Sequence, residues 1–513
     1  MNRDGCIKRA LAYFDDGHYV LDLARRVAIP SESQNPDRLP DLARYLAEEM
    51  VPAFEAMGFA CRVFDNPIEG GGPVLLAQRM EDEALPTVLG YGHGDVIRGY
   101  EDQWLEGLSP WQTVQRGDRL YGRGTADNKG QHTLNMCAMN AVLQERGRLG
   151  FNAKFIIETG EENGSAGLKE IIEANLDAFR ADSFIASDGP RVAPDRPTVF
   201  LGARGAKNFD LSVDLRQGGH HSGNWGGLLA NPGIILAHAL ASVVSQTGRI
   251  QIPEWLPEPM SNSVRNALKD ITIDGGENAP DIDPEWGDAG LTPAEQVFGW
   301  NSFEVLAFTT GNPKNPVNAI PPKARAHCQI RFVAGSRRDE FLPALRRHLD
   351  DHGFDMVQIT PPPPGNAIDF TATRTDPDHP WVRWAAAAME RTTGKKTAVL
   401  PNLGGSICND LFSDLLGLPT IWIPHSYGAC SQHAPNEHIL LSEARDAMGI
   451  MTGLYWDLGE PGTPTLERHS RQRDIRPPRA GTLLNRPIPR PLRRTPRLPE
   501  RWDTGPGFCQ AVE

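Results

Sequence analysis

Long apolar runs and paired cysteines are both missing from this chain. None of its apolar runs approaches the roughly 18 residues that a membrane-spanning helix needs. Its seven cysteines are scattered and form no C-x-x-C pair, which argues against a disulfide framework and against a thiolate zinc site. The first residues also lack the charged-then-apolar layout of a secretory signal, so we expect a cytoplasmic protein.

Positive charge is in deficit as well. The formal net charge of −13 disfavours nucleic acids and anionic membranes as partners, although a local site can still be positive. The balance of 40% hydrophobic and 23% charged residues is that of an ordinary globular protein. A chain of 513 residues is too long for a single core, and about two to four domains are expected.

A histidine and an aspartate follow the first strong strand signal. The apolar run Thr87–Leu89 leads into Tyr91–Asp95, with the sequence YGHGD. Because side chains alternate along a strand, His93 and Asp95 point to the same side, and the glycines leave room for another group to approach. Taken alone, such a pair is more simply a loop histidine near a capping aspartate.

Three later segments also present acids where predicted strands end. These are Asp127 in the glycine-rich loop 120–130, Glu161 and Glu162 after a strand at 151–157, and Asp188 after a strand at 183–187. Strands that alternate with helices predict a mostly parallel sheet, whose ligands bind beyond the carboxyl ends of its strands. We therefore expect these acids to converge with the first His–Asp pair on one site.

Two of these segments have alternative interpretations. The adjacent carboxylates of Glu161 and Glu162 are costly unless a cation compensates them, but they would also suit the first turn of a predicted helix at 165–179. The loop 120–130 resembles a phosphate cradle only superficially. It lacks the G-x-x-x-x-G-K-[ST] spacing and carries an acid where phosphate needs donors.

The predicted fold class is α/β, with a mostly parallel mixed sheet flanked by helices and a smaller α/β domain inserted into it. Apolar and polar residues alternate strictly at 208–215, which predicts a half-exposed antiparallel strand. This pattern differs from that of the preceding strands and indicates that another domain begins here. We place the catalytic domain at 1–202 and 366–458, and the inserted domain at 203–365. The Pro- and Arg-rich tail at 459–513 has no periodicity, so we expect it to be disordered.

A late histidine, His433, completes a set of side chains that could bind metal. Two histidines, two aspartates and a glutamate, without thiolate, suit Zn²⁺, Mn²⁺ or Co²⁺. With one carboxylate bridging, such a set holds two divalent ions, which polarise a carbonyl and lower the pKa of a shared water to about 7. A neighbouring carboxylate that is not a ligand then serves as the general base.

In order and spacing, these motifs resemble those of the dinuclear zinc metallopeptidases, the family of carnosinase, cytosolic non-specific dipeptidase, aminoacylase, carboxypeptidase G, acetylornithine deacetylase and succinyl-diaminopimelate desuccinylase. The similarity covers residues 18–457 and implies a zinc-exopeptidase-like fold with two divalent ions, Zn²⁺ first and Mn²⁺ or Co²⁺ as alternatives. The metal ligands that it implies are His93, Asp127, Glu162, Asp188 and His433, with Asp127 bridging. It also implies a cis peptide bond between Asp127 and Asn128.

The resemblance implies three residues that act in the chemistry. Asp95 would orient and polarise the ligand His93, and Glu161 would be the general base. His221 lies in a His-Ser-Gly segment of the inserted domain, which resembles the lid and dimerisation domain of the family. It would stabilise the tetrahedral oxyanion in the site of the partner subunit.

The resemblance also implies the groups that hold the substrate. Arg331 matches the arginine that grips a substrate carboxylate with its fork of donors. Gly405 and Ser406 belong to a glycine loop that binds the same carboxylate. Asn318 stands where carnosinase-like members often carry threonine, and Glu437 matches a position behind the metal ligands.

We therefore predict a homodimeric metallohydrolase that cleaves an amide bond next to a free carboxylate, as a dipeptidase or carboxypeptidase acting on small peptides. Asp188 favours the peptidase branch, because deacetylase-like members more often carry glutamate at that ligand. One alternative is an N-acyl-amino-acid deacylase, with N-acyl amino acids as substrates and the same metals and arginine. The other is a metal-free, dimeric binding protein of the same fold.

Overall fold

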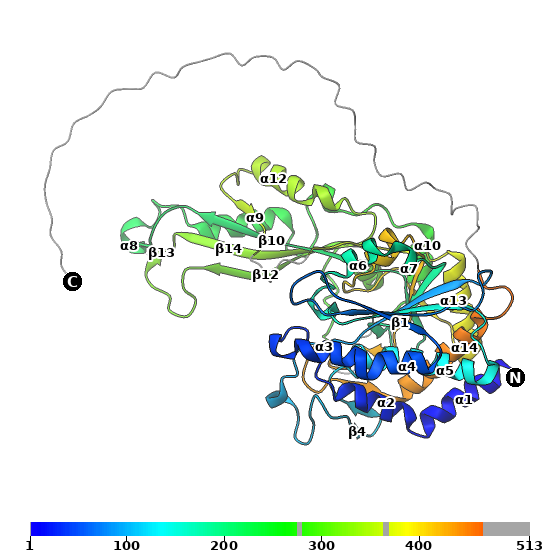
Figure 1. Ribbon diagram of the computed structural model, residues 1–513. Helices are drawn as coiled ribbons and strands as arrows, with labels where there is room; N and C mark the ends of the chain where they lie inside the picture. The colour runs from blue at the N-terminus through cyan, green and yellow to red at the C-terminus, as the bar shows by residue number, and fades with distance from the viewer. Residues whose placement is uncertain (1, 274–279, 363–368, 465–513) are drawn as a thin grey trace, which may run out of the picture. The chain divides into compact units, whose positions relative to one another are not determined.

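The computed structural model describes residues 2–273, 280–362 and 369–464 (Figure 1). These described residues form one compact unit. The tail that we predicted to be disordered lies outside the described residues from residue 465 onward. Within the described ranges, no helix is both long and apolar enough to cross a bilayer.

A mixed sheet of eight described strands forms the centre of the fold, in the order β1-β2-β6-β3-β7-β18-β9-β17. The strands are β1 (Ala60–Phe64), β2 (Val74–Arg79), β3 (Thr87–His93), β6 (Asn152–Glu158), β7 (Ser183–Ala186), β9 (Thr198–Phe200), β17 (Ala398–Leu400) and β18 (Thr420–Trp422). The pairings β6–β3, β3–β7, β7–β18 and β9–β17 are parallel. The predicted fold class, α/β with a mostly parallel sheet flanked by helices, is confirmed.

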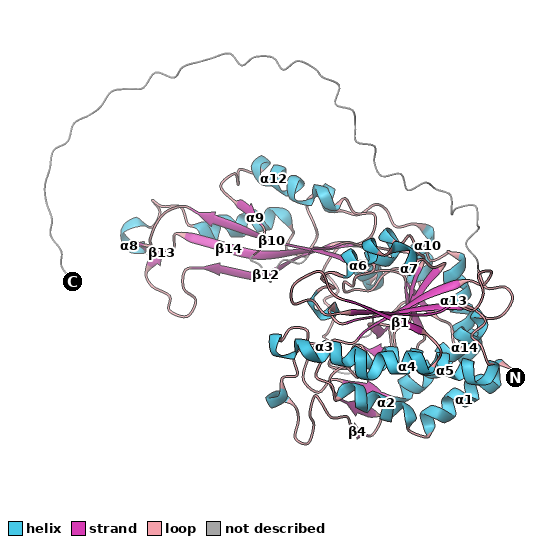
Figure 2. Cartoon of the chain, viewed as in Figure 1, coloured by secondary structure: helices cyan, strands magenta, loops and turns pink. Residues whose placement is uncertain are grey.

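Helices cover both faces of this sheet (Figure 2). Successive side chains of a strand point to opposite faces, so Leu75 enters one apolar core and Leu76 the other. The helices packed on the first core include α1 (Arg3–Asp15), α2 (His18–Val27), α5 (Lys129–Arg146), α13 (Pro380–Thr393) and α14 (Leu441–Leu458). Those packed on the second are α6 (Leu168–Ala174), α7 (Leu176–Phe179), α10 (Asn262–Leu268) and α11 (Pro293–Gly299).

A second sheet has the order β12-β14-β10-β15, with β16 beside β10. Its strands are β10 (Gly205–Asp214), β12 (Ser302–Thr310), β14 (Lys323–Phe332), β15 (Gln358–Thr360) and β16 (Asp369–Phe370). Alternation along β14 buries Cys328 and Ile330 against α9 (Pro232–Val243) and α12 (Phe341–Asp351), and leaves Gln329 on the polar face. The antiparallel strand expected at 208–215 is present as β10, but it is mostly buried and not half-exposed, because β14 pairs with it on one side and β15 and β16 on the other. The exact domain boundaries stay a prediction.

Some local expectations were wrong or incomplete. The single helix expected at 165–179 is divided into α6 and α7 at Asn175, which is not helical. Between residues 18 and 57 the chain forms α2 and then an unbroken helical run, made of α3 (Leu39–Tyr45), the π-helix Leu46–Met50 and α4 (Val51–Ala56). Tertiary contacts therefore override the helical pattern at several boundaries.

The strand before Asp127 does not belong to the central sheet, contrary to our expectation. It is β5 (Arg119–Tyr121), which pairs with β4 (Val114–Arg116) and with β20 (His438–Leu440) in a separate three-stranded sheet. This pairing joins segments that are far apart in the sequence, so no local pattern indicates it. The loop after β5 leads into α5.

Candidate metal centre

Five side chains that are distant in the sequence converge beyond the carboxyl ends of the central strands. The possible ligand atoms of His93, Asp127 and Asp188 lie within 4.8 Å of one another, and so do those of Asp127, Glu162 and His433. Asp127 belongs to both groups. The structure therefore brings all five predicted ligands together in the arrangement expected for two ions with one bridging carboxylate.

The parallel strands explain how three of these residues meet. His93 is the last residue of β3, Asp188 follows β7, and Glu162 lies in the short 3-10 helix Glu161–Asn163 after β6. Because β6 and β7 flank β3 on its two sides, their ends deliver the side chains to one place. His433 arrives from the loop before β20, with a left-handed backbone conformation (φ 59°).

Asp127 and the two histidines form the centre of the cluster. The Nε2 atom of His93 lies 3.0 Å from Asp127 Oδ1 and 3.6 Å from Asp188 Oδ2. The Nε2 atom of His433 lies 3.0 Å from Asp127 Oδ2 and 3.1 Å from Glu162 Oε2. Each imidazole thus points its Nε2 atom at two carboxylates, as the ligands of a divalent ion do.

The electrostatics of the cluster fit a site made for cations. Burial raises the pKa of Glu162 to about 7, and it raises the pKa of Glu161 well above its ordinary value. Hydrogen bonds to Asp127 and Glu162 raise the pKa of His433 to about 11. Buried carboxylates of this density require compensating positive charge, and two divalent ions would supply it without protons.

Asp95 contacts both halves of the cluster. Its carboxylate accepts hydrogen bonds from the main-chain N–H groups of Glu161 (3.2 Å) and Glu162 (3.1 Å). The Nδ1 atom of His93 lies 3.1 Å from the carbonyl oxygen of Asp95 and 3.5 Å from its carboxylate. The role predicted for Asp95, orienting His93, stays a prediction, and the contact with the Glu161–Glu162 turn adds to it.

The loop that carries Asp127 is held by a residue near the other end of the chain. The Oε1 atom of Glu437 accepts hydrogen bonds from the main-chain N–H groups of Gly124, Ala126 and Asp127. The peptide bond between Asp127 and Asn128 is cis, as expected. The sequence pointed to Glu437 only as a position behind the ligands and did not reveal which loop it binds.

Gln432 is a site residue that the sequence interpretation missed. Its side-chain amide donates a 2.6 Å hydrogen bond to Asp127 Oδ2, the atom that also faces His433. Its position directly before His433 was the available signal. An amide that donates to the bridging carboxylate fixes the orientation of that carboxylate.

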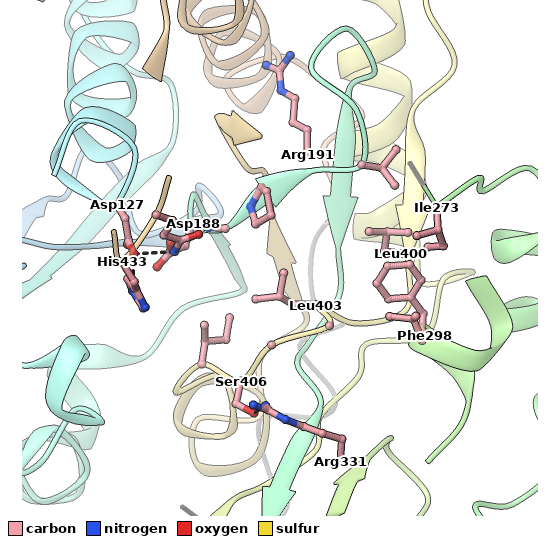
Figure 3. Close-up of a pocket in the computed structure, with 18 of the residues that line it drawn as sticks. Asp127, Asp188, Arg191, Ile273, Phe298, Arg331, Leu400, Leu403, Ser406 and His433 are labelled. Atoms are coloured by element: carbon pink, nitrogen blue, oxygen red, sulfur yellow. Dashed lines mark hydrogen bonds and ion pairs between the residues drawn. The ribbon is translucent and has the colours of Figure 1, made fainter. Parts of the chain in front are cut away.

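A pocket of about 630 Å³ opens beside the cluster (Figure 3). Its lining includes Asp127, Glu161, Asp188 and His433 at one end. Glu161 therefore faces the space next to the ligands without belonging to either group of possible ligand atoms. This is the position that a general base needs.

Arg331 lies in the same pocket, together with the glycine loop. Its Nη1 atom donates a 3.0 Å hydrogen bond to Ser406 Oγ, and its Nε atom donates a 2.9 Å bond to Gln329 Oε1. Gly405 lines the pocket next to Ser406. The structure thus brings the three residues predicted to hold a substrate carboxylate into one wall, although their role stays a prediction.

His221 and Asn318 are neighbours, but they are not among the described residues that line this pocket. The short strand β11 (His220–His221) pairs with β13 (Ala319–Ile320), and the carbonyl of Asn318 accepts the main-chain N–H of Ser222. Both His221 and Asn318 are exposed. Within one chain, these two predicted site residues are therefore together but apart from the lining of the pocket.

Comparison with known proteins adds a family and several relatives. The sequence pattern of Peptidase family M20/M25/M40 matches residues 89–457. The "Cysteinylglycine-S-conjugate dipeptidase" of Corynebacterium striatum is 28% identical over 337 residues, which cover 63% of this chain and 70% of that protein. The "Beta-Ala-His dipeptidase" of Homo sapiens is 36% identical over 292 residues, which cover 54% of this chain and only 56% of that protein.

Among solved structures, the M20 family metallo-carboxypeptidase Sso-CP2 from Sulfolobus solfataricus has a similar fold. It aligns with a TM-score of 0.71 and 24% sequence identity, covering 86% of this chain and 99% of that chain. At this identity the likeness concerns the fold. It places the central sheet and its helices in an architecture already known among peptidases.

Proposed function

This chain belongs to Peptidase family M20/M25/M40, and on that premise we propose that it is a two-metal dipeptidase. It would hydrolyse the amide bond of a small peptide next to a free C-terminal carboxylate. The observation that carries the proposal is a pocket lined at one end by Asp127, Asp188 and His433, which are members of the two ligand groups, and in another wall by the Arg331–Ser406 pair. The two curated relatives, both named as dipeptidases, support the substrate class.

The donor set defines what the bound ions would be. His93 and Asp188 would hold one ion, Glu162 and His433 the other, and Asp127 would bridge them. When bound, such ions polarise an amide carbonyl and acidify a water molecule. Imidazole and carboxylate ligands without thiolate favour Zn²⁺ in our proposal, with Mn²⁺ or Co²⁺ as alternatives.

Glu161 would move the proton. Its carboxylate faces the pocket, and burial raises its pKa, so it can take a proton from the attacking water and release it to the departing amine. Asp95 holds the main-chain N–H groups of the Glu161–Glu162 turn and thereby fixes where the base stands. Orientation of this kind is a large part of what a protein contributes to catalysis.

The other wall would bind the free carboxylate of the substrate. Arg331 presents planar N–H donors, and its bonds to Gln329 and Ser406 limit its movement. The Ser406 hydroxyl in turn donates to the carbonyl of Arg204. A guanidinium held in this way suits two parallel hydrogen bonds to a carboxylate.

A homodimer with an exchanged histidine would complete the site. His221 is exposed and lies beside Asn318, so in our proposal both are presented together to the pocket of a second subunit. The strand β12 is an edge of the second sheet as described, and it exposes Val305, Leu306 and Phe308. An apolar edge strand of this kind supports self-association.

One experiment separates the proposed function from its alternatives. Protein reconstituted with Zn²⁺ is assayed against a panel of dipeptides and, in parallel, against N-acetyl amino acids. Faster turnover of the dipeptides is expected, whereas exclusive turnover of the N-acyl compounds would make the protein a deacylase. A metal content near zero after careful purification, with no turnover after reconstitution, would favour the alternative of a metal-free binding protein.

The cytoplasmic location also stays a proposal, to be tested by cell fractionation.

A further inference from the structure

The pocket has an apolar wall that neither the metal ligands nor Arg331 explains. Six apolar residues form this wall, which we call the apolar recess: Val192, Ile273, Val297, Phe298, Leu400 and Leu403. In Figure 3, Leu403 is drawn between the metal side of the pocket and the group of Ile273, Phe298 and Leu400. A wall of this composition is typical of a site that binds an apolar group.

The recess is the open edge of the second core. Val192, Ile273, Val297 and Leu403 are only partly buried, and all four pack against the buried residues of that core. The same four side chains line the pocket. Their remaining apolar surface faces the pocket, so an apolar ligand group placed there would cover it and gain free energy roughly in proportion to the buried area.

The recess adjoins the wall that would bind the substrate carboxylate. A Cβ atom added to Gly404 would stand 3.5 Å from Cγ1 of Val297 and 3.9 Å from Cε1 of Phe298. Gly404 directly precedes Gly405 and Ser406. The side chain nearest to a bound carboxylate is the one on the same residue, so the recess is placed for the C-terminal residue of a dipeptide.

Leu403 connects the recess to the metal side. A Cβ atom added to Gly189 would stand 3.2 Å from Cδ1 of Leu403, and Gly189 follows the proposed ligand Asp188. Leu403 therefore lies between the glycine beside a ligand and the loop that contains Ser406. A C-terminal residue bound by its carboxylate would have to pass its side chain along Leu403.

The charges around the recess disfavour a charged side chain. Among the described residues that line the pocket, the acids are Asp127, Glu161 and Asp188, all at the metal end. Arg191 also lines it; its Nη1 atom lies 3.0 Å from Asp446 and its Nε atom 3.4 Å from Glu443, while its Nη2 atom is buried without a hydrogen-bond partner. The six apolar side chains of the recess themselves offer a charged substrate group no replacement for its lost hydration.

The recess also draws on α11 and on the chain before it. Ile273 precedes this helix, and Val297 and Phe298 lie within it. The start of α11 is fixed by a capping box, in which Thr292 and Glu295 bond to each other's main chain. The helix therefore presents its apolar residues from a defined position.

We propose that the apolar recess binds the side chain of the substrate's C-terminal residue, and that the protein prefers dipeptides ending in a large apolar residue such as leucine or phenylalanine. This proposal rests on the dipeptidase function proposed above. It goes further because it names the substrate class and the residues that select it.

A substrate series with a constant N-terminal alanine tests the proposal. Ala-Gly, Ala-Leu, Ala-Phe, Ala-Asp and Ala-Lys are compared on Zn²⁺-reconstituted protein. We expect kcat/KM for Ala-Leu and Ala-Phe to exceed that for Ala-Gly by about tenfold or more. Equal values, or a preference for Ala-Asp or Ala-Lys, would contradict the proposed role of the recess in binding the C-terminal side chain. Such a result would leave the proposed dipeptidase function in place.

A binding measurement decides the case in which no dipeptide is hydrolysed, an outcome that would overturn the proposed function itself. A free amino acid keeps both the carboxylate and the side chain of the C-terminal residue. Calorimetric titration of the same protein should then show leucine and phenylalanine binding about tenfold more tightly than glycine or aspartate. Equal affinities, or no binding, would overturn the recess as well.

A pair of matched variants assigns the effect to the recess. Val297→Thr keeps the shape of the side chain but adds a hydroxyl, and it should lower the ratio of kcat/KM for Ala-Leu to that for Ala-Gly about fivefold. Val20→Thr makes the same change at a partly buried valine of α2 outside the pocket and should not alter the ratio. A loss for Leu-Ala in place of Ala-Leu would contradict the proposal, because the recess would then serve the N-terminal residue.

Discussion

Glu437 accepts a 3.1 Å hydrogen bond from the main-chain N–H of Asp127, although 310 positions separate the two residues. Its second carboxylate oxygen accepts a 2.7 Å bond from Arg123, and the side chains of Arg123 and Glu437 are each only 1% exposed. The proposed bridging ligand is thus fixed through its main chain by a buried ion pair. The position of Asp127 depends on contacts that lie behind the metal centre.

We expect Glu437→Ala to weaken both folding and metal binding. The change leaves three main-chain donors and the Arg123 guanidinium buried without their partner, which costs about 3–5 kcal/mol. Metal affinity should fall about 10- to 100-fold. Glu437→Gln keeps an acceptor for the main chain and should recover part of both losses. Chelator competition and thermal melting provide the measurements, and unchanged metal affinity in the alanine variant would contradict the positioning role.

Glu161→Gln should separate catalysis from metal binding. Glu161 lines the pocket but belongs to neither group of possible ligand atoms, so the variant should keep two ions per chain. The amide cannot accept the proton of the water, and kcat should fall about 100- to 10,000-fold. Elemental analysis and steady-state kinetics test this together. A variant that binds one ion would make Glu161 a ligand, and a variant with normal kcat would place the base elsewhere.

Arg331→Ala should act on recognition of the substrate carboxylate. Loss of a charge-assisted hydrogen bond is worth about 1.5–3 kcal/mol, so kcat/KM for a dipeptide should fall about 10- to 100-fold. The same dipeptide with a C-terminal amide lacks the charge and should lose much less. Arg325→Ala, on the same strand but outside the pocket lining, is the control. If kcat/KM fell equally for the dipeptide and for its C-terminal amide, Arg331 would not bind the substrate carboxylate.

Stability should decrease between about pH 5 and pH 7 because of Glu443. Burial raises the pKa of Glu443 from 4.5 to about 7, with Arg191 opposing the shift from 3.4 Å. Between these values the folded chain holds a proton that the unfolded chain has released, so the free energy of unfolding falls as the pH rises, by about 3 kcal/mol for this group. Glu443→Gln should flatten this slope in urea unfolding curves. Glu170→Gln, at an exposed position of α6, should keep it.

The sequence was sufficient to predict those site residues that lie at the ends of strands, because local patterns indicate such strands. His93, Glu161, Glu162 and Asp188 each follow a short apolar run that forms a strand of the central sheet, and parallel neighbours bring such ends together. The order of these motifs along the chain also indicated the family. Strand ends are therefore the feature of this fold that can be inferred from alternation and apolar runs alone.

The sequence did not reveal the contacts made by pairing across long distances. The loop of Asp127 and the segment of His433 are joined by β5 and β20, in which Tyr121 pairs with His438, and nothing near either strand indicates the other. The apolar recess was missed for a similar reason. Ile273 and Val297 are 24 positions apart in the sequence, and only the folded chain places them together on the open edge of a core.

His221 offers a test of whether two subunits share one site. It is exposed, it lies beside Asn318, and it does not line the pocket of its own chain in the described residues. We expect His221→Ala to lower kcat strongly, because loss of one oxyanion donor costs about 100- to 1,000-fold. A single variant cannot tell which subunit provides the donor. Two complementary variants, each inactive as a homodimer, can.

The expected result is recovery of activity in a mixed dimer. Glu161→Gln and His221→Ala chains with different affinity tags are produced together, and the mixed dimer is purified through both tags. If the histidine acts on the partner's site, the site that keeps Glu161 receives an intact His221, and activity returns to about half of the wild-type value. If the histidine acts within its own chain, both sites lack one group and the mixed dimer stays inactive. A protein that sediments as an active monomer would also exclude the shared site, because no partner would then be present to supply His221.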